Sequence, residues 1–184
     1  IEASENTNFI FENNMLYTKG YKILLAVTGD IQSVIINETT EEIESFSIYN
    51  RNVKEIYIPA SVIRIGGESA LGVFKLDKLE VDEKNQNYAS YDNDLYDKKL
   101  ETLIKCNKEG NIIIKDGVKK ITSGAFLNTV TGITLPESIE SISGWRLIPY
   151  SVNYLYIPQN LNNIDMTTIM DLKEIEVSEE NTKY

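Results

Sequence analysis

The chain has 184 residues, of which 42% are hydrophobic and 25% are charged, and its formal net charge is −10. This composition is typical of a folded globular protein, and the acidic balance argues against nucleic acid as a partner, because phosphate binding needs a basic face. Histidine is absent, which excludes Ser-His-Asp triads and histidine-ligated metals, and we expect no cofactor. No apolar run has the length of a bilayer span, so we expect no direct membrane insertion in this segment.

Short apolar-x-apolar segments recur along the whole chain. Their second apolar residues are Ala3, Ile36, Ile58, Val81, Ile114, Leu135, Ile157 and Val177. The steps between them are nearly equal, except for two longer steps, from Ala3 to Ile36 and from Val81 to Ile114. The alternation is typical of a strand with one buried face, and a period of about 20 residues indicates a solenoid. Pro59, Pro136 and Pro158 directly follow three of the segments, where proline ends a strand. We therefore predict a single repeat-solenoid domain over residues 1–184.

A second apolar pair follows each of four strands and predicts the return side of the repeat. Its members stand four and seven positions beyond the strand: Val62 and Ile65, Val118 and Ile121, Ile139 and Ile142, and Leu161 and Ile164. Ser61, Ser138, Asn160 and Gly117 stand where the backbone must turn, and such residues favour turns. Around residues 121–126 we expect one helical turn, with Phe126 packed inward.

The two long steps contain similar inserts, near residues 13–27 and 92–106. The run Asn13–Gly20 aligns with Asp92–Lys99 at a constant offset, and we predict that each insert is a β-hairpin extending from the solenoid edge. Burial of Leu16, Tyr17, Leu95 and Tyr96 would anchor the hairpins. The acidic run that begins at Asp92 is similar to a calcium loop but lacks the glycine and the glutamate that an EF-hand requires, so we interpret it as a turn.

The two ends of the chain share one phase of the repeat. Residues 172–184 match residues 76–88, and residues 1–9 match both. We therefore expect the chain to be a fragment of a longer array.

Several runs resemble the BspA-type leucine-rich repeats. The resemblance rests on Ile-x-Ile-Pro-x-Ser-Val-x-x-Ile at 56–65, Asp-Gly-Val-x-x-Ile-x-x-x-Ala-Phe at 116–126, Leu-Pro-x-Ser-Ile-x-x-Ile at 135–142, and Asn85 and Tyr88 followed by Leu95 and Tyr96. It implies a right-handed leucine-rich-repeat superhelix of short parallel strands, with turns or short helical turns on the return side. It also implies a secreted or cell-surface protein of bacteria or protozoa that mediates adhesion. Segments 66–70, 142–145 and 165–168 lack the family's Ala-Phe pair.

The middle residue of each strand should point away from the core. These residues are Ile35, Tyr57, Glu80, Ile113, Thr134, Tyr156 and Glu176. Stacked strands would place them in one row at spacings of about 4.8 Å, and we expect this row to bind a protein or host-matrix ligand. The alternative is that residues with high strand propensity simply fill strands.

Catalysis has little support in the sequence. The carboxylate pairs Asp82-Glu83 and Glu179-Glu180 could in principle serve a glycosidase, but they recur at equivalent positions, as exposed turns do. We predict a non-enzymatic binding module. The alternatives are a structural spacer that projects another domain and, more weakly, a carbohydrate-active β-solenoid. We expect Cys106 to be a buried, inert thiol and Trp145 to be buried in the return side.

Overall fold

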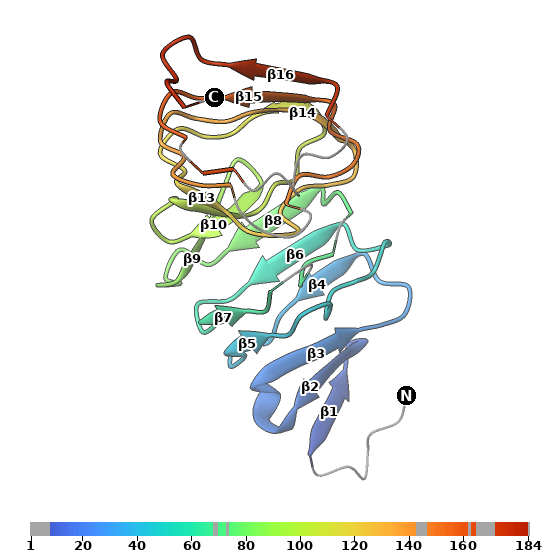
Figure 1. The fold of residues 1–184 in the computed structure, drawn as a ribbon. Helices are drawn as coiled ribbons and strands as arrows, with labels where there is room; N and C mark the ends of the chain where they lie inside the picture. The colour runs from blue at the N-terminus through green and yellow to red at the C-terminus, as the bar shows by residue number, and fades with distance from the viewer. Residues whose placement is uncertain are drawn as a thin grey trace.

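The structure is a computed structural model that describes residues 8–67, 70–72, 74–142, 147–161, 163–164 and 172–183. Short strands stack one above another from the N-terminal to the C-terminal end, which confirms the predicted solenoid of short strands (Figure 1). Ile1 and Ala3, the first expected strand residues, lie outside the described part.

Parallel strands form the face of the solenoid that we call the front. One front sheet has the order β4 (Ser33–Ile35), β6 (Glu55–Ile58) and β8 (Lys78–Val81). The other has the order β12 (Gly110–Ile113), β14 (Val130–Thr134), β15 (Tyr154–Ile157) and β16 (Glu174–Val177). Of the predicted inward residues, Val34, Ile36, Ile56, Ile58, Leu79, Val81, Ile112, Ile114, Ile133, Leu135, Leu155 and Ile157 are buried. The prediction is wrong for Ile175, which is 46% exposed, and Val177 is only half-buried, because β16 is the edge strand of its sheet.

The return side is made of very short strands and turns. Its strands are β5 (Glu42–Ile43), β7 (Arg64–Ile65) and β13 (Lys120–Ile121), and an isolated parallel bridge joins Ile142 to Ile164. The prediction of a helical turn around residues 121–126 is wrong. β13 occupies its start instead, because Ile121 pairs with Leu103 and the Thr122 amide donates to the Leu103 carbonyl at 3.0 Å. Phe126 packs inward as predicted.

Each insert is a three-stranded antiparallel meander. The first comprises β1 (Phe9–Glu12), β2 (Met15–Thr18), the 3₁₀ turn η1 (Lys19–Tyr21) and β3 (Ile23–Val27), and the second comprises β9 (Tyr88–Tyr91), β10 (Asp94–Asp97) and β11 (Thr102–Lys105). The predicted hairpins are therefore present, but they do not extend from the edge. β3 and β11 pair in parallel with β5 and β13 and so continue the return side.

The first turn of each meander explains the resemblance between the two inserts. Asn13 and Asn14 have φ of 50° and 61°, and Asp92 and Asn93 have φ of 51° and 65°. Two consecutive left-handed residues are what a two-residue type I′ hairpin turn requires, and asparagine and aspartate tolerate that conformation. The acidic run at Asp92 is thus a turn, as predicted. Tyr17, Leu95 and Tyr96 are buried as expected, whereas Leu16 is only half-buried.

The second meander divides both the front sheet and the core. Within the described ranges, β8 and β12 belong to different sheets and do not pair with each other. One core cluster runs from Met15 to Leu95, and the other runs from Tyr96 to Ile164. The core is therefore divided at β10: its adjacent residues Leu95 and Tyr96 belong to different clusters, because successive side chains of a strand point to opposite faces.

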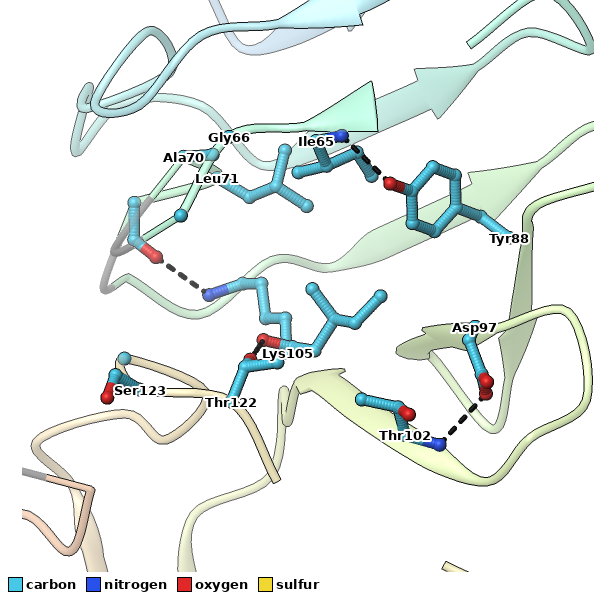
Figure 2. Close-up of a pocket in the computed structure, with 14 residues that line it drawn as sticks. Ile65, Gly66, Ala70, Leu71, Tyr88, Asp97, Thr102, Lys105, Thr122 and Ser123 are labelled. Atoms are coloured by element: carbon cyan, nitrogen blue, oxygen red, sulfur yellow. Dashed lines mark hydrogen bonds between the residues drawn. The ribbon is translucent and has the colours of Figure 1, made fainter. Parts of the chain in front are cut away.

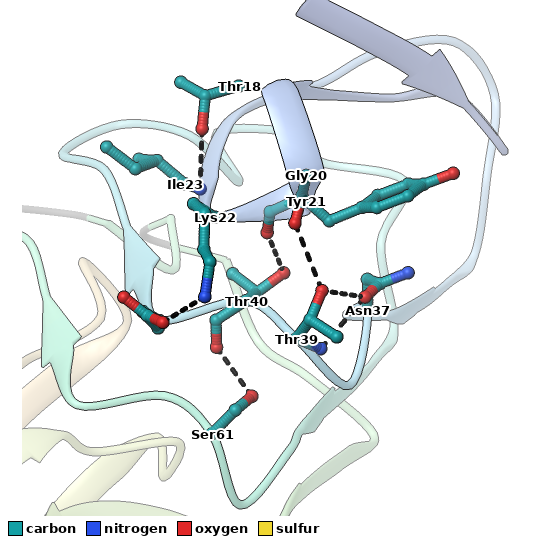
Figure 3. A network of polar contacts seen from close by, with 10 residues as sticks. Thr18, Gly20, Tyr21, Lys22, Ile23, Asn37, Thr39, Thr40 and Ser61 are labelled. Atoms are coloured by element: carbon teal, nitrogen blue, oxygen red, sulfur yellow. Dashed lines mark hydrogen bonds and ion pairs between the residues drawn. The ribbon is translucent and has the colours of Figure 1, made fainter.

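Side-chain hydroxyls link neighbouring turns of the solenoid (Figure 3). The Ser61 hydroxyl donates to the Thr40 carbonyl at 2.7 Å, and the Thr40 hydroxyl donates to the Tyr21 carbonyl at 2.8 Å. In the C-terminal half, the Ser138 hydroxyl donates to the Val118 carbonyl at 2.8 Å. These side chains satisfy carbonyls that the strands leave unpaired where the backbone turns.

A buried asparagine closes the turn after β8. Asn85 is fully buried, and its amide donates to the carbonyls of Pro59 and Val62, each at 2.9 Å. Its side-chain oxygen accepts from the Asn87 and Tyr88 amides, each at 2.8 Å. One side chain therefore satisfies four backbone groups and ties this turn to the preceding repeat.

Candidate functional site

The register of the front strands aligns the predicted binding residues in two strips. Ile35 lies opposite Tyr57, and Tyr57 lies opposite Glu80. We call these three residues the N-terminal strip. The C-terminal strip consists of Ile113, Thr134, Tyr156 and Glu176, which are consecutive cross-strand partners.

The expectation of a single row running through both sheets is wrong because the second meander separates the strips. The amide of Leu79 on β8 donates to the Asn93 side chain at 2.7 Å, and the amide of Val81 donates to the Ser90 hydroxyl at 3.2 Å. These side chains take the place of carbonyls from a next strand. The edge of β8 is thus closed before β12 begins.

Exposure differs along the strips. Ile35 and Ile113 are 65% and 76% exposed, which is unusual for isoleucine in a folded protein. Tyr57, Thr134 and Tyr156 are half-buried, and the glutamates at the two strip ends are exposed. Both strips therefore present apolar or aromatic area next to negative charge.

A second outward row lies beside the first and was missed in the sequence. It consists of Ser33, Glu55 and Lys78 in one sheet and of Asn111, Gly132, Tyr154 and Glu174 in the other. The sequence pattern could have predicted this row, because each of its residues stands two positions before a strip residue and therefore lies on the same face of its strand.

Gly132 allows Tyr154 to lie against the C-terminal sheet. A Cβ at Gly132 would lie 2.6 Å from the Asn111 side-chain oxygen and 3.3 Å from Tyr154 Cδ1. The absence of a side chain thus leaves room for the ring over the sheet. The ring adds aromatic area directly beside the C-terminal strip.

Carboxylates fix two of the tyrosines. The Tyr57 hydroxyl donates to Asp82 Oδ2 at 2.8 Å, and the Tyr154 hydroxyl donates to Glu176 Oε2 at 2.8 Å. Each hydrogen bond raises the pKa of its tyrosine to about 12, because ionising the phenol would place two negative charges together. Both rings are therefore neutral and oriented at physiological pH.

The described acidic residues and Cys106 do not form a metal site. No group of three or more Cys, Asp and Glu side chains among them could hold a metal ion. Asp92 and Asp94, which gave the calcium-like run, lie 2.7 and 3.4 Å from Lys108 Nζ. Cys106 is buried, and burial raises the pKa of its thiol to about 12, as expected for an unreactive cysteine.

The carboxylate pairs lie at turns. Asp82 accepts from the Lys84 amide at 2.8 Å and so caps a turn, while Glu83, Glu179 and Glu180 are exposed.

No helix in the ranges that the structure describes has the length and hydropathy of a membrane span. Trp145 lies outside these ranges.

Comparison with known proteins identifies the repeat. The family profile described as "BspA type Leucine rich repeat region" matches residues 5–104 and 101–184, in six copies. No curated protein sequence matches the chain significantly.

Three solved structures are similar to the chain. A leucine-rich repeat protein from Eubacterium ventriosum is 23% identical, with a TM-score of 0.54 over 80% of this chain and 42% of that protein. The pneumococcal vaccine antigen PcpA is 15% identical over 95% of this chain and 82% of that one, with a TM-score of 0.41. A leucine-rich cell surface protein from Faecalibacterium prausnitzii is 18% identical over 80% and 60%, with a TM-score of 0.38. The first supports the fold, and the chain spans less than half the length of that protein.

Proposed function

Because the chain belongs to the BspA-type leucine-rich repeat family, we propose that it is a non-enzymatic binding module, secreted or attached to a cell surface, that mediates adhesion by holding a protein or host-matrix ligand on its front face. The leucine-rich repeats favour protein–protein interaction, because a stacked array offers an extended surface. The surface location and the adhesive role are the expectations that the family resemblance implies.

The C-terminal strip carries the proposal. It is the longer of the two strips, and it contains Tyr156 and Ile113, the most exposed isoleucine among the described residues, while Tyr154 lies directly beside it. Tyrosine is enriched among the residues that dominate binding energy, because its ring buries a large area with little conformational freedom to lose. Glu174 and Glu176 border this surface, so the ligand that fits it has an apolar centre and a basic rim.

The test compares binding by matched variants. A panel of purified matrix proteins is immobilised, and binding of the chain is measured by surface plasmon resonance. Tyr156→Ala should weaken binding by about 2 kcal/mol or more if Tyr156 is an anchor. Ile35→Ala, which removes exposed apolar area from the N-terminal strip, should leave binding unchanged.

The spacer alternative gives a different outcome. If the chain only projects another domain, Tyr156→Ala will not affect attachment of the full-length protein to cells. An unrelated solenoid of equal length will then restore attachment as well as this chain does. That result would refute the proposed binding role.

A further inference from the structure

A cavity of about 370 Å³ lies on the return side, where the second meander interrupts the stacking. Its upper wall in Figure 2 is formed by Ile65 and Gly66, at the end of β7, with Ala70 and Leu71, and its lower wall by β11 and the turn after β13. Tyr88 stands at one side, where its hydroxyl accepts the Ile65 amide at 2.9 Å. The cavity has the size of a small-molecule site.

Lys105 is the unusual residue of this cavity. It lines the cavity although it is only 3% exposed. Its ammonium can donate three hydrogen bonds, and in the described part of the chain it makes one, to the Gly72 carbonyl at 3.1 Å. None of the ion pairs between described residues includes it. A buried cation that no described carboxylate neutralises is costly, so the described part of this site favours an anion that arrives with a ligand.

The other charges near Lys105 are already engaged. Asp94 on β10 accepts the Asn107 amide at 2.6 Å and lies 3.4 Å from Lys108 Nζ. Asp97 lines the far side of the cavity, where its Oδ1 accepts the Glu101 and Thr102 amides, each at 2.8 Å.

The residues that line the cavity indicate the chemistry of the remainder of the ligand. The lining includes the aliphatic residues Ile65, Leu71 and Ile104 and the hydroxyl-bearing residues Thr102, Thr122 and Ser123. The Thr122 hydroxyl already donates to the Ile104 carbonyl at 3.2 Å. A single lysine matches one negative charge, whereas a phosphate dianion is better served by several cations or an arginine fork. Asp97 adds repulsion against a dianion.

We propose that this cavity binds a carboxylate carried on a small apolar group, with the carboxylate paired to Lys105 and the apolar group against Ile65, Leu71 and Ile104. The site lies on the return side and is independent of the ligand surface proposed for the front face.

The experiment titrates ¹⁵N-labelled protein with 4-phenylbutyrate and follows the glycine amides that line the cavity, Gly66, Gly67, Gly72 and Gly124. These signals should shift with saturation, and the neutral amide 4-phenylbutanamide should cause no comparable shift. Lys105→Met, which keeps the length of the side chain but removes its charge, should weaken binding at least about 30-fold. The control Lys119→Met removes an exposed lysine that pairs with Glu101 at 2.9 Å and should bind as the unmodified chain does.

A pH series separates charge recognition from a purely structural role of Lys105. Burial lowers the pKa of Lys105 to about 8, and the carboxylate of Asp94 partly offsets this effect. The ammonium is present below that pH and lost above it, while the ligand carboxylate stays ionised. Affinity should therefore fall about tenfold between pH 7 and pH 9. The Cys106 thiol stays neutral over this range, because burial raises its pKa to about 12, and the Tyr88 phenol, whose pKa burial also raises, stays neutral as well.

Four outcomes would overturn the proposal: no glycine shift with 4-phenylbutyrate, equal binding of the amide, unchanged binding by Lys105→Met, or equal affinity at pH 7 and pH 9. The pH series and the amide comparison use the unmodified chain, so they remain decisive if Lys105→Met fails to fold. Matrix binding by the front face is measured separately and should not change in Lys105→Met.

Discussion

Ile112 and Ile113 are adjacent isoleucines on β12 that face opposite ways, so the same substitution at each tests the strand phase. Ile112 is 4% exposed, and Ile113 is 76% exposed. Replacing Ile112 with alanine removes three buried carbons, and at about 0.8 kcal/mol for each the transfer contribution is about 2.4 kcal/mol. The cavity that remains adds to this loss, and the usual total is about 2–5 kcal/mol. We expect the lower half of that range, because β12 is the edge strand of its sheet and its surroundings can relax.

Ile113→Ala is the matched control. The side chain that it removes is mostly in water already, so the free energy of unfolding should change by less than about 0.5 kcal/mol. Both variants are measured by urea denaturation followed by circular dichroism. Equal losses of stability, or a larger loss for Ile113→Ala, would refute the assignment of inward and outward faces.

Three further results are expected. Asn85→Ala leaves buried carbonyls and amides without partners and should lower the free energy of unfolding by about 1–3 kcal/mol; no loss would contradict its role as a link between repeats. Gly66→Ala places a Cβ 2.5 Å from a backbone nitrogen of the neighbouring turn and should lower the free energy of unfolding by about 1–3 kcal/mol. Gly67→Ala should be nearly neutral, because a Cβ added there meets no atom within 4 Å outside its chain neighbours. Thermal melting of the two variants tests this difference. The pKa of Tyr57, raised to about 12 mainly by the hydrogen bond to Asp82, should fall towards 10 in Asp82→Asn, as ultraviolet titration of the phenolate would show; an unchanged value would exclude that hydrogen bond.

The strand phase could be predicted because burial imposes it directly on the residue pattern. Val34 and Ile36, or Ile133 and Leu135, alternate with outward residues, and the period of a strand leaves no other arrangement. The turn at Asp92 was predicted as well. The equivalent turn at Asn13 was not, although asparagine suits the left-handed backbone conformation that this turn needs.

The interruption of the front sheet could not be read from the same pattern. The long step from Val81 to Ile114 indicates an insert, but it does not say which strand of the insert continues the ladder. That choice depends on side chains such as Asn93 and Ser90, which close the edge of β8 through contacts that no local period encodes. Lys105 was missed for a related reason: a lysine in a strand is ordinarily exposed, and its burial follows from the irregular junction around it.

Backbone NOEs test the division of the solenoid most directly. The structure predicts interstrand NOEs between Tyr57 and Glu80 and between Thr134 and Tyr156, which are cross-strand partners. It also predicts NOEs from the Leu79 amide to the Asn93 side chain, which accepts its hydrogen bond. Interstrand NOEs between β8 and β12 would instead show one continuous front sheet and would contradict the two separate strips.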